Sequence, residues 1–350
     1  MTPRRTTCQA RYLPSHHLFP FGTVFLMILV LASLLVVLPA YNNARPVLAG
    51  SSFAFTVAGD YGQTKNTTAV LQTIAKAGAS FNLAIGDLNY DYPTVSAQQW
   101  STYVKSYVGA SFPFEILVGE HDTADISQLA TDLPNRIANI SGSYAGQYYF
   151  DYPSGAPLAR FLMVSPGLSP YNYAKGSTDY NWVARTIDGA RAAHIPWVIV
   201  GMHKYCIVID SDHTNTCSGY DLINLLLSKK VDLILQGQKH GYQASKQLAL
   251  NTTTCTSLTV GSYNSHCVVS ASTSLTRGAG SVILISGTGG KSLSTVDISD
   301  PETGYFRKWM GGNANPTWGV SEVAVSATQL NIHFARASGG TFSDSFTIHT

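Results

Sequence analysis

Short strings that pair a glycine with an acidic or histidine residue recur along the chain, and they constrain its fold more than any other feature. They are Gly59-Asp60-Tyr61-Gly62, Gly86-Asp87-Leu88-Asn89-Tyr90, Gly119-Glu120-His121-Asp122, Gly201-Met202-His203 and Gly237-Gln238-Lys239-His240. The apolar runs before them are typical of buried strands: Phe53–Ala58, Phe81–Ile85, Phe114–Val118, Trp197–Val200 and Val231–Leu235. Because the carboxyl ends of neighbouring strands in an open α/β sheet meet in one crevice, we expect these side chains to converge. Carboxylates and imidazoles brought together in this way make a metal site the first hypothesis.

Helical patterns alternate with the strand-like runs. Apolar spacing predicts helices over Asn66–Ala77, Ala97–Val108, Tyr180–Ala193 and Tyr220–Lys229. Further strands are expected at Tyr148–Tyr152, Arg160–Val164, Ser321–Val325, Leu330–Ala335 and Phe346–His349. The alternation predicts βαβ units in an α/β domain, and the tail beyond Tyr305 is expected to be antiparallel. Asn251–Gly280 lacks periodicity, so we expect a surface insertion beside the site.

The amino-terminal segment has the features of an export signal or a membrane anchor. Three arginines and no acidic residue precede an apolar run from Phe21 to Ala40. The run is long enough to cross a bilayer core about 30 Å thick. Residues 1–50 are therefore predicted to form a cytoplasmic flank, a hydrophobic signal or anchor helix and a linker, and residues 51–350 an extracytoplasmic domain. Cleavage, which yields a secreted protein, and retention as a membrane anchor both stay open.

Composition and cysteine usage agree with export. Charged residues make up 12% of the chain and the formal net charge is +2, so no nucleic-acid-binding surface is indicated. Beyond Cys8 in the flank, the cysteines form an even set: Cys206, Cys217, Cys255 and Cys267. Local pairs 206–217 and 255–267 are favoured, while other connectivities and free thiols stay open.

The order of the strings resembles a known family. GDxG, GDxxY, GxHD, GMH and GxxHGY, followed by Ser286-Gly287-Thr288-Gly289-Gly290, are similar to the calcineurin-like metallophosphoesterases, in particular the purple acid phosphatase branch. The resemblance runs from about Phe53 to the end of the chain and implies a sandwich of two β-sheets flanked by helices. In the purple branch the tyrosine matching Tyr90 supplies a phenolate to ferric iron. Gly62 stands where other branches carry a ligand histidine.

The resemblance also implies two metal ions and their ligands. The first ion would be held by Asp60, Asp87, Tyr90 and His240. The second would be held by Asp87 as the bridging carboxylate, Glu120, His203 and Gln238. His121 matches the family histidine that contacts phosphate or protonates the leaving group.

Two departures from the family pattern fall on the second metal. Glu120 replaces an asparagine and Gln238 replaces a histidine, which shifts the site towards harder oxygen ligands. If the three carboxylates and a Tyr90 phenolate are all charged, two divalent ions leave no net charge, whereas Fe(III) with a divalent ion leaves one positive charge. We therefore expect Fe(III) at the first site and divalent Mn, Mg or Zn at the second.

The implied function is hydrolysis of a phosphate monoester or diester by a metal-bound hydroxide, with His121 assisting departure of the ester oxygen. The partner would be a phosphorylated small molecule or a nucleotide, together with the membrane if the amino-terminal segment is not cleaved. The alternative, favoured by Glu120 and Gln238, is a degenerate member that binds metal or ligand without turnover.

Overall fold

The computed structural model describes residues 52–210 and 220–350, which belong to one compact unit. Its first sheet contains β1 (Phe53–Ala58), β2 (Phe81–Ile85), β3 (Phe114–Leu117), β12 (Ser274–Thr276), β15 (Thr317–Val325), β16 (Gln329–Gly339) and β17 (Ser345–His349). Its second sheet contains β4 (Ser141–Ser143), β5 (Gln147–Tyr152), β6 (Ala159–Val164), β7 (Trp197–Met202), β8 (Leu233–Gln236), β9 (Tyr242–Ser245), β13 (Val282–Ser286) and β14 (Phe306–Met310). A small ribbon joins β10 (Gln247–Leu248) and β11 (Val268–Ser270).

Each large sheet has a parallel part whose strands end on the same side. In the first sheet the order is β12-β17-β16-β15-β1-β2-β3, with β1, β2 and β3 parallel. In the second the order is β14-β9-β13-β8-β7-β6-β5-β4, with β6, β7, β8 and β13 parallel. The carboxyl ends of these parallel strands carry the strings that the sequence singles out.

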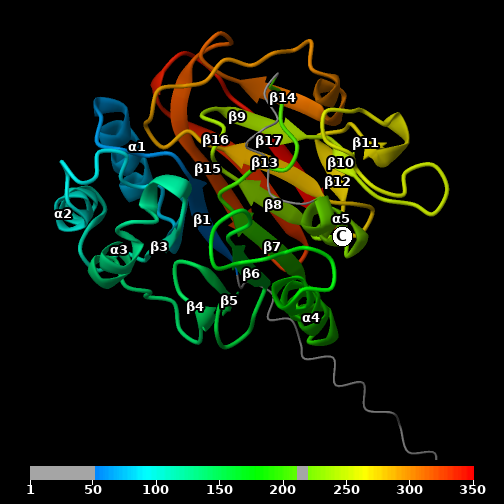
Figure 1. Ribbon diagram of the computed structural model, residues 1–350, viewed down its shortest axis with the longest axis horizontal. Coiled ribbons are helices and arrows are strands. Elements are labelled where there is room, and N and C mark those ends of the chain that lie inside the picture. The colour runs from blue at the N-terminus through cyan, green and yellow to red at the C-terminus, as the bar shows by residue number, and fades with distance from the viewer. Residues whose placement is uncertain (1–51, 211–219) are drawn as a thin grey trace, which may run out of the picture. The chain divides into compact units, whose positions relative to one another are not determined.

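Helices cover the outer face of each sheet. They are α1 (Lys65–Lys76), α2 (Ala97–Val108), α3 (Ile126–Asp132), α4 (Thr178–Ala192) and α5 (Tyr220–Ser228), with 3₁₀ turns η1 (Glu120–Asp122), η2 (Ser265–Cys267) and η3 (Pro301–Tyr305). In Figure 1, α1, α2 and α3 lie on one side of the sheets and α4 and α5 on the other. The apolar stripes of α1 and α2 pack on the first sheet, and those of α4 and α5 pack on the second.

The central core lies between the two sheets. Phe55 and Phe81 of the first sheet pack against Phe161 of the second, with ring centroids 5.0 and 5.2 Å from that ring. Burying these rings fixes one sheet against the other, because aromatic side chains carry much of the apolar area in a core. The predicted sandwich of two sheets flanked by helices is therefore confirmed.

Most predicted elements agree with the structure to within a few residues. The prediction for Asn251–Gly280 is wrong in part, because Ser274–Thr276 of that stretch forms β12, which pairs in parallel with β17 as an edge strand. The Cys255–Cys267 disulfide is confirmed. Cys217 lies outside the described residues, as does the whole predicted signal or anchor segment at residues 1–50. In the described part of the chain, no helix is long and apolar enough to cross a membrane.

Candidate metal centre

Two buried aspartates follow the first two strands of the parallel part of the first sheet. Asp60 comes after β1 and Asp87 after β2, and both have left-handed backbones, with φ of 66° and 51°. Such a conformation is uncommon for residues other than glycine and often marks a functional site. It turns the chain sharply at the strand end and leaves both carboxylates inside the crevice.

The Tyr90 hydroxyl lies at the centre of the first group of ligand atoms. It is 2.9 Å from Asp60 Oδ1, 2.9 Å from Asp87 Oδ2 and 2.8 Å from His240 Nε2. The other ring nitrogen of His240, Nδ1, lies 2.9 Å from the Ser292 carbonyl. Since a carbonyl only accepts, Nδ1 carries the hydrogen and the Nε2 lone pair faces Tyr90. A histidine oriented in this way is typical of metal ligands.

A second group of ligand atoms shares Asp87 with the first. His203 Nε2 lies 3.3 Å from Asp87 Oδ1 and 3.1 Å from Glu120 Oε2. His203 Nδ1 donates to the Ile85 carbonyl at 2.9 Å, so a neutral ring would present its lone pair to both carboxylates. A lone pair and two carboxylate oxygens repel one another unless a cation lies between them. Either a proton on Nε2 or a metal ion meets that need.

The loop after β8 completes this second group. The Gln238 backbone N–H donates to Asp60 Oδ2 at 3.0 Å, and its side-chain Nε2 donates to Glu120 Oε1 at 2.9 Å. The remaining Gln238 atom, Oε1, is buried without a hydrogen-bond partner, as are Glu120 Oε2 and His203 Nε2. Buried polar atoms are normally hydrogen-bonded, and His203 Nε2 and Glu120 Oε2 lie 3.1 Å apart, so a proton or a metal ion is needed between them. The donor set therefore fits a metal ion.

Two glycines allow these loops to approach each other closely. A Cβ atom at Gly86, whose φ is +90°, would lie 2.6 Å from the His203 ring. A Cβ atom at Gly119 would collide with Asp87. Only glycine fits at both positions, which explains why these two strings begin with that residue.

The buried His203 and the acids around it shift one another's pKa values. Burial lowers the pKa of His203, but Asp87 and Glu120 outweigh it and raise that pKa well above its ordinary value. Burial raises the pKa of Glu120, but the adjacent His203 imidazole outweighs it and lowers that pKa to about 2. Burial and the nearby Asp60 and Asp87 raise the pKa of Tyr90. A Tyr90 phenolate therefore requires a strong cation beside it.

His121, the histidine proposed to assist departure of the ester oxygen, lies at the edge of the cluster. The His121 backbone N–H donates to Asp87 Oδ1 at 3.0 Å, and its ring centroid is 4.5 Å from that of Tyr90. The ring is exposed and can meet a ligand from solvent.

Sequence reasoning gave no role to Asp122, Lys204 or Lys291. Buried Asp122 accepts from the backbone N–H groups of Leu88 and Gly119, each at 2.8 Å, and so ties the loop after β3 to the loop after β2. Lys204 Nζ lies 3.6 Å from Glu120 Oε2. Lys291 Nζ lies 4.1 Å from the centroid of the Tyr90 ring. Asp122 lies within a string that was already singled out, and Lys204 and Lys291 each directly follow one, which was the available signal.

The structure thus brings together every residue proposed as a metal ligand. They are Asp60, Asp87, Tyr90, Glu120, His203, Gln238 and His240. Among the residues described, Asp60, Asp87 and His203 each offer one ligand atom, and these atoms lie within 4.8 Å of one another. Ligation itself stays a prediction.

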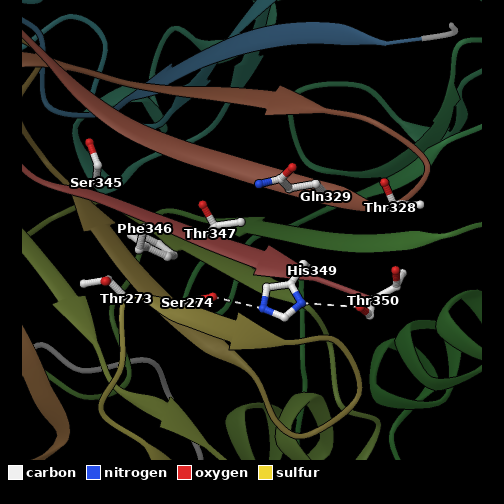
Figure 2. A pocket seen from close by; sticks show the side chains of 9 residues that line it. All are labelled: Thr273, Ser274, Thr328, Gln329, Ser345, Phe346, Thr347, His349 and Thr350. Carbon is white, nitrogen blue, oxygen red and sulfur yellow. Dashed lines mark hydrogen bonds between the residues drawn. The ribbon is translucent and has the colours of Figure 1, made fainter.

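An open pocket of about 510 Å³ lies elsewhere on the molecule, at the edge of the first sheet (Figure 2). Its lining consists of Thr273, Ser274, Thr328, Gln329, Ser345, Phe346, Thr347, His349 and Thr350. Ser274 Oγ lies 3.0 Å from His349 Nε2, but the lining holds no carboxylate side chain and a single histidine. This pocket is not the predicted metal site.

Comparisons of the sequence find phosphatases. A phosphoenolpyruvate phosphatase from Allium cepa is 24% identical over 218 residues, covering 57% of this chain and 43% of the relative. A nucleotide pyrophosphatase/phosphodiesterase from Hordeum vulgare is 23% identical over 291 residues, covering 76% of this chain and 70% of the relative. Purple acid phosphatase 18 from Arabidopsis thaliana is 25% identical, and the match spans 45% of its length. The chain thus spans less than half of two of these relatives. No family model matches the chain.

Comparisons of the fold agree. The structure of a purple acid phosphatase from yellow lupin (Lupinus luteus) seeds matches with a TM-score of 0.62 and 16% identity, covering 86% of this chain and 54% of that one. GAP50, the anchor in the inner membrane complex of Plasmodium, matches with a TM-score of 0.58 and 14% identity, covering 86% and 90%. By sequence the chain is therefore similar to purple acid phosphatases, and its fold matches that of a solved purple acid phosphatase.

Proposed function

We propose that this protein is a metal-dependent hydrolase of phosphate esters. The observation that carries the proposal is the convergence of carboxylate, imidazole, amide and phenol groups from five strand ends on two adjoining points. Three of those groups have buried lone-pair atoms that lack a hydrogen-bond partner. The phosphatases and the phosphodiesterase among the relatives support the same reaction class.

The residues fit two ions that share Asp87. Its Oδ2 faces Tyr90, within the first group of ligand atoms, and its Oδ1 faces His203, within the second. Asp60, Tyr90 and His240 would complete the first site; Glu120, His203 and Gln238 would complete the second. Fe(III) at the first site and Mn, Mg or Zn at the second follow from the family resemblance. When bound, such ions activate water for attack and stabilise charge on a phosphoryl group.

The protein's own groups orient the ligands and handle protons. The Ile85 and Ser292 carbonyls hold the two histidine rings with Nε2 facing inward. Asp122 anchors the loops that carry Asp87 and Glu120 through their backbone N–H groups. The exposed His121 ring can donate a proton to the ester oxygen as it leaves. Small phosphorylated molecules and nucleotides are the proposed substrates, and substrate choice among them would depend on the surrounding loops.

A second candidate function is a protein of this fold that binds ligands without turnover. Its support is the fold match to GAP50, which is described as an anchor, and the altered residues Glu120 and Gln238. The first group of ligand atoms retains every residue that the resemblance implies, which favours the enzyme.

The test is hydrolysis of p-nitrophenyl phosphate and bis(p-nitrophenyl) phosphate by the metal-loaded protein. Asp87→Ala removes the shared carboxylate, so we expect turnover to fall by about 10³-fold or more. Asp188→Ala, an exposed aspartate in α4, is the matched control and should retain full activity. Turnover that survives Asp87→Ala would come from a contaminating hydrolase. A metal-loaded parent protein without turnover would favour the second candidate function.

A further inference from the structure

Two lysines, Lys204 and Lys291, lie beside the ligand cluster, each on a different loop. Lys204 follows His203 after β7, and its Nζ is 3.6 Å from Glu120 Oε2. Lys291 follows the glycine-rich turn after β13, and its Nζ lies 4.1 Å from the centre of the Tyr90 ring. One cation therefore adjoins the second group of ligand atoms and the other adjoins the first.

We propose that Lys204 and Lys291 supply the positive charge with which this site attracts a phosphoryl group. The proposal rests on the proposed function and extends it to two residues outside the ligand set. Glu120 places a carboxylate where the family pattern has a neutral asparagine, and Lys204 offsets that added negative charge. Lys291 does the same for the charge of a Tyr90 phenolate.

The burial of these lysines makes their charges effective. The Lys204 side chain is 14% exposed, so bulk water screens its charge only weakly. Lys291 is partly buried, and the aromatic face beneath it attracts the ammonium. A third lysine in the site loops, Lys239, forms an ion pair with Asp210, which is not one of the proposed ligands, so its charge is compensated outside the ligand cluster.

The lysines change the conclusion drawn from ligand charges alone. That count required Fe(III) for the site to keep a positive charge. With Lys204 and Lys291 included, two divalent ions already leave the centre with two positive charges, enough to attract a phosphate dianion. Phosphate attraction therefore does not decide which metal occupies the first site. That choice depends on the chemistry of Tyr90.

The experiment measures binding of inorganic phosphate to the Mn²⁺-loaded protein by calorimetry, which requires no turnover. We expect Lys204→Met and Lys291→Met each to weaken phosphate binding about tenfold, the loss typical of one partly buried charge. We expect Lys204→Met to bind Mn²⁺ more tightly, because a repelling charge beside the ion is gone. Lys204→Arg keeps the charge and should retain parental phosphate affinity. Lys229→Met removes a lysine paired with Asp188 far outside the ligand cluster and should behave like the parent.

A double variant that removes both charges tests whether Lys204 offsets the charge of Glu120. Glu120→Asn with Lys204→Met removes one charge of each sign, so phosphate affinity should return towards that of the parent. If phosphate binds Lys204→Met and Lys291→Met as tightly as it binds the parent, the proposal is wrong. Failure of the parent to hydrolyse aryl phosphates would overturn the proposed function alone, because phosphate binding is measured separately.

Discussion

The identity of single residues decides how each metal would be held. Tyr90 is the residue whose hydroxyl contacts Asp60, Asp87 and His240 at once. Gly62 lies beside its ring, where a Cβ atom would make an ordinary contact at 3.6 Å from Tyr90 Cδ2, and the φ of +66° at this position favours glycine. Tyr90 would hold the first ion through that hydroxyl, and Gly62 stands where the family resemblance places a ligand histidine in other branches.

Replacing Tyr90 tests whether the first ion is iron. In protein purified with iron, Tyr90→Phe should abolish the visible absorption that a phenolate ligand gives to Fe(III) and should lower the iron retained after dialysis. Tyr92→Phe, at a tyrosine that is 43% exposed, is the matched control and should keep the band. Absorption that is the same in both variants would show that Tyr90 does not bind the ion.

Restoring the family's second-site residues tests whether Glu120 and Gln238 are ligands. Glu120→Asn with Gln238→His supplies an imidazole and removes a negative charge, so we expect zinc affinity at that site to rise about tenfold or more. Zinc titration by calorimetry measures it, with the exposed exchange Gln128→His in α3 as control. If the double variant binds zinc as the parent does, the two residues lie beside the ion without contacting it.

At the scale of elements, β3 carries a charge that its burial disfavours. Glu115 is fully buried in that strand, and its Oε1 accepts from the Arg136 backbone N–H at 2.9 Å. Burial raises the pKa of Glu115 from 4.5 to about 7. Between those two pH values, Glu115 therefore keeps its proton in the folded protein, whereas in the unfolded chain it has already released it. Its free energy of unfolding must fall as the pH rises from about 4.5 to above 7.

Glu115→Gln should remove this pH dependence while keeping the acceptor. Relative to the parent, we expect roughly 1–3 kcal/mol more stability at pH 8 and little difference at pH 4. Urea unfolding at both pH values measures the change, and Glu322→Gln on β15 serves as control. A gain of the same size at both pH values would show that the Glu115 charge is not the cause.

The elements predicted well from sequence have strong local signals. The predicted and observed bounds of α2 agree because Ser96 caps the helix. Its side chain accepts from the Gln99 N–H at 3.2 Å, and Gln99 Oε1 accepts from the Ser96 N–H. The edge strand β12 was missed because three residues with a single apolar side chain, Leu275, form a strand only when β17 is there to pair with. Lys204 and Lys291 were missed for a similar reason: their partners Glu120 and Tyr90 lie far away in the sequence.

At the scale of the whole molecule, the candidate metal centre joins the two sheets. Asp60, Asp87 and Glu120 follow strands of the first sheet, whereas His203 and His240 follow strands of the second. An ion bound between them would therefore hold the sheets together at the crevice, beyond the aromatic core. Without it, a proton on His203 and the Lys204 ammonium are the positive charges beside Asp87 and Glu120, and neither links the two sheets through several ligands at once.

Removal of metal should for this reason lower the stability of the entire domain. An ion that binds only the folded state at 100 to 1,000 times its Kd contributes about 3–4 kcal/mol, which corresponds to a fall in Tm of roughly 5–10 °C on chelation. Differential scanning calorimetry with and without a chelator measures this, and readdition of Mn²⁺ should reverse it. Asp87→Ala, which lacks the shared carboxylate, should start near the chelated value and respond little to the chelator. Equal Tm values for the parent with and without chelator would show that no ion links the sheets, because binding between them cannot leave the folded state unaffected.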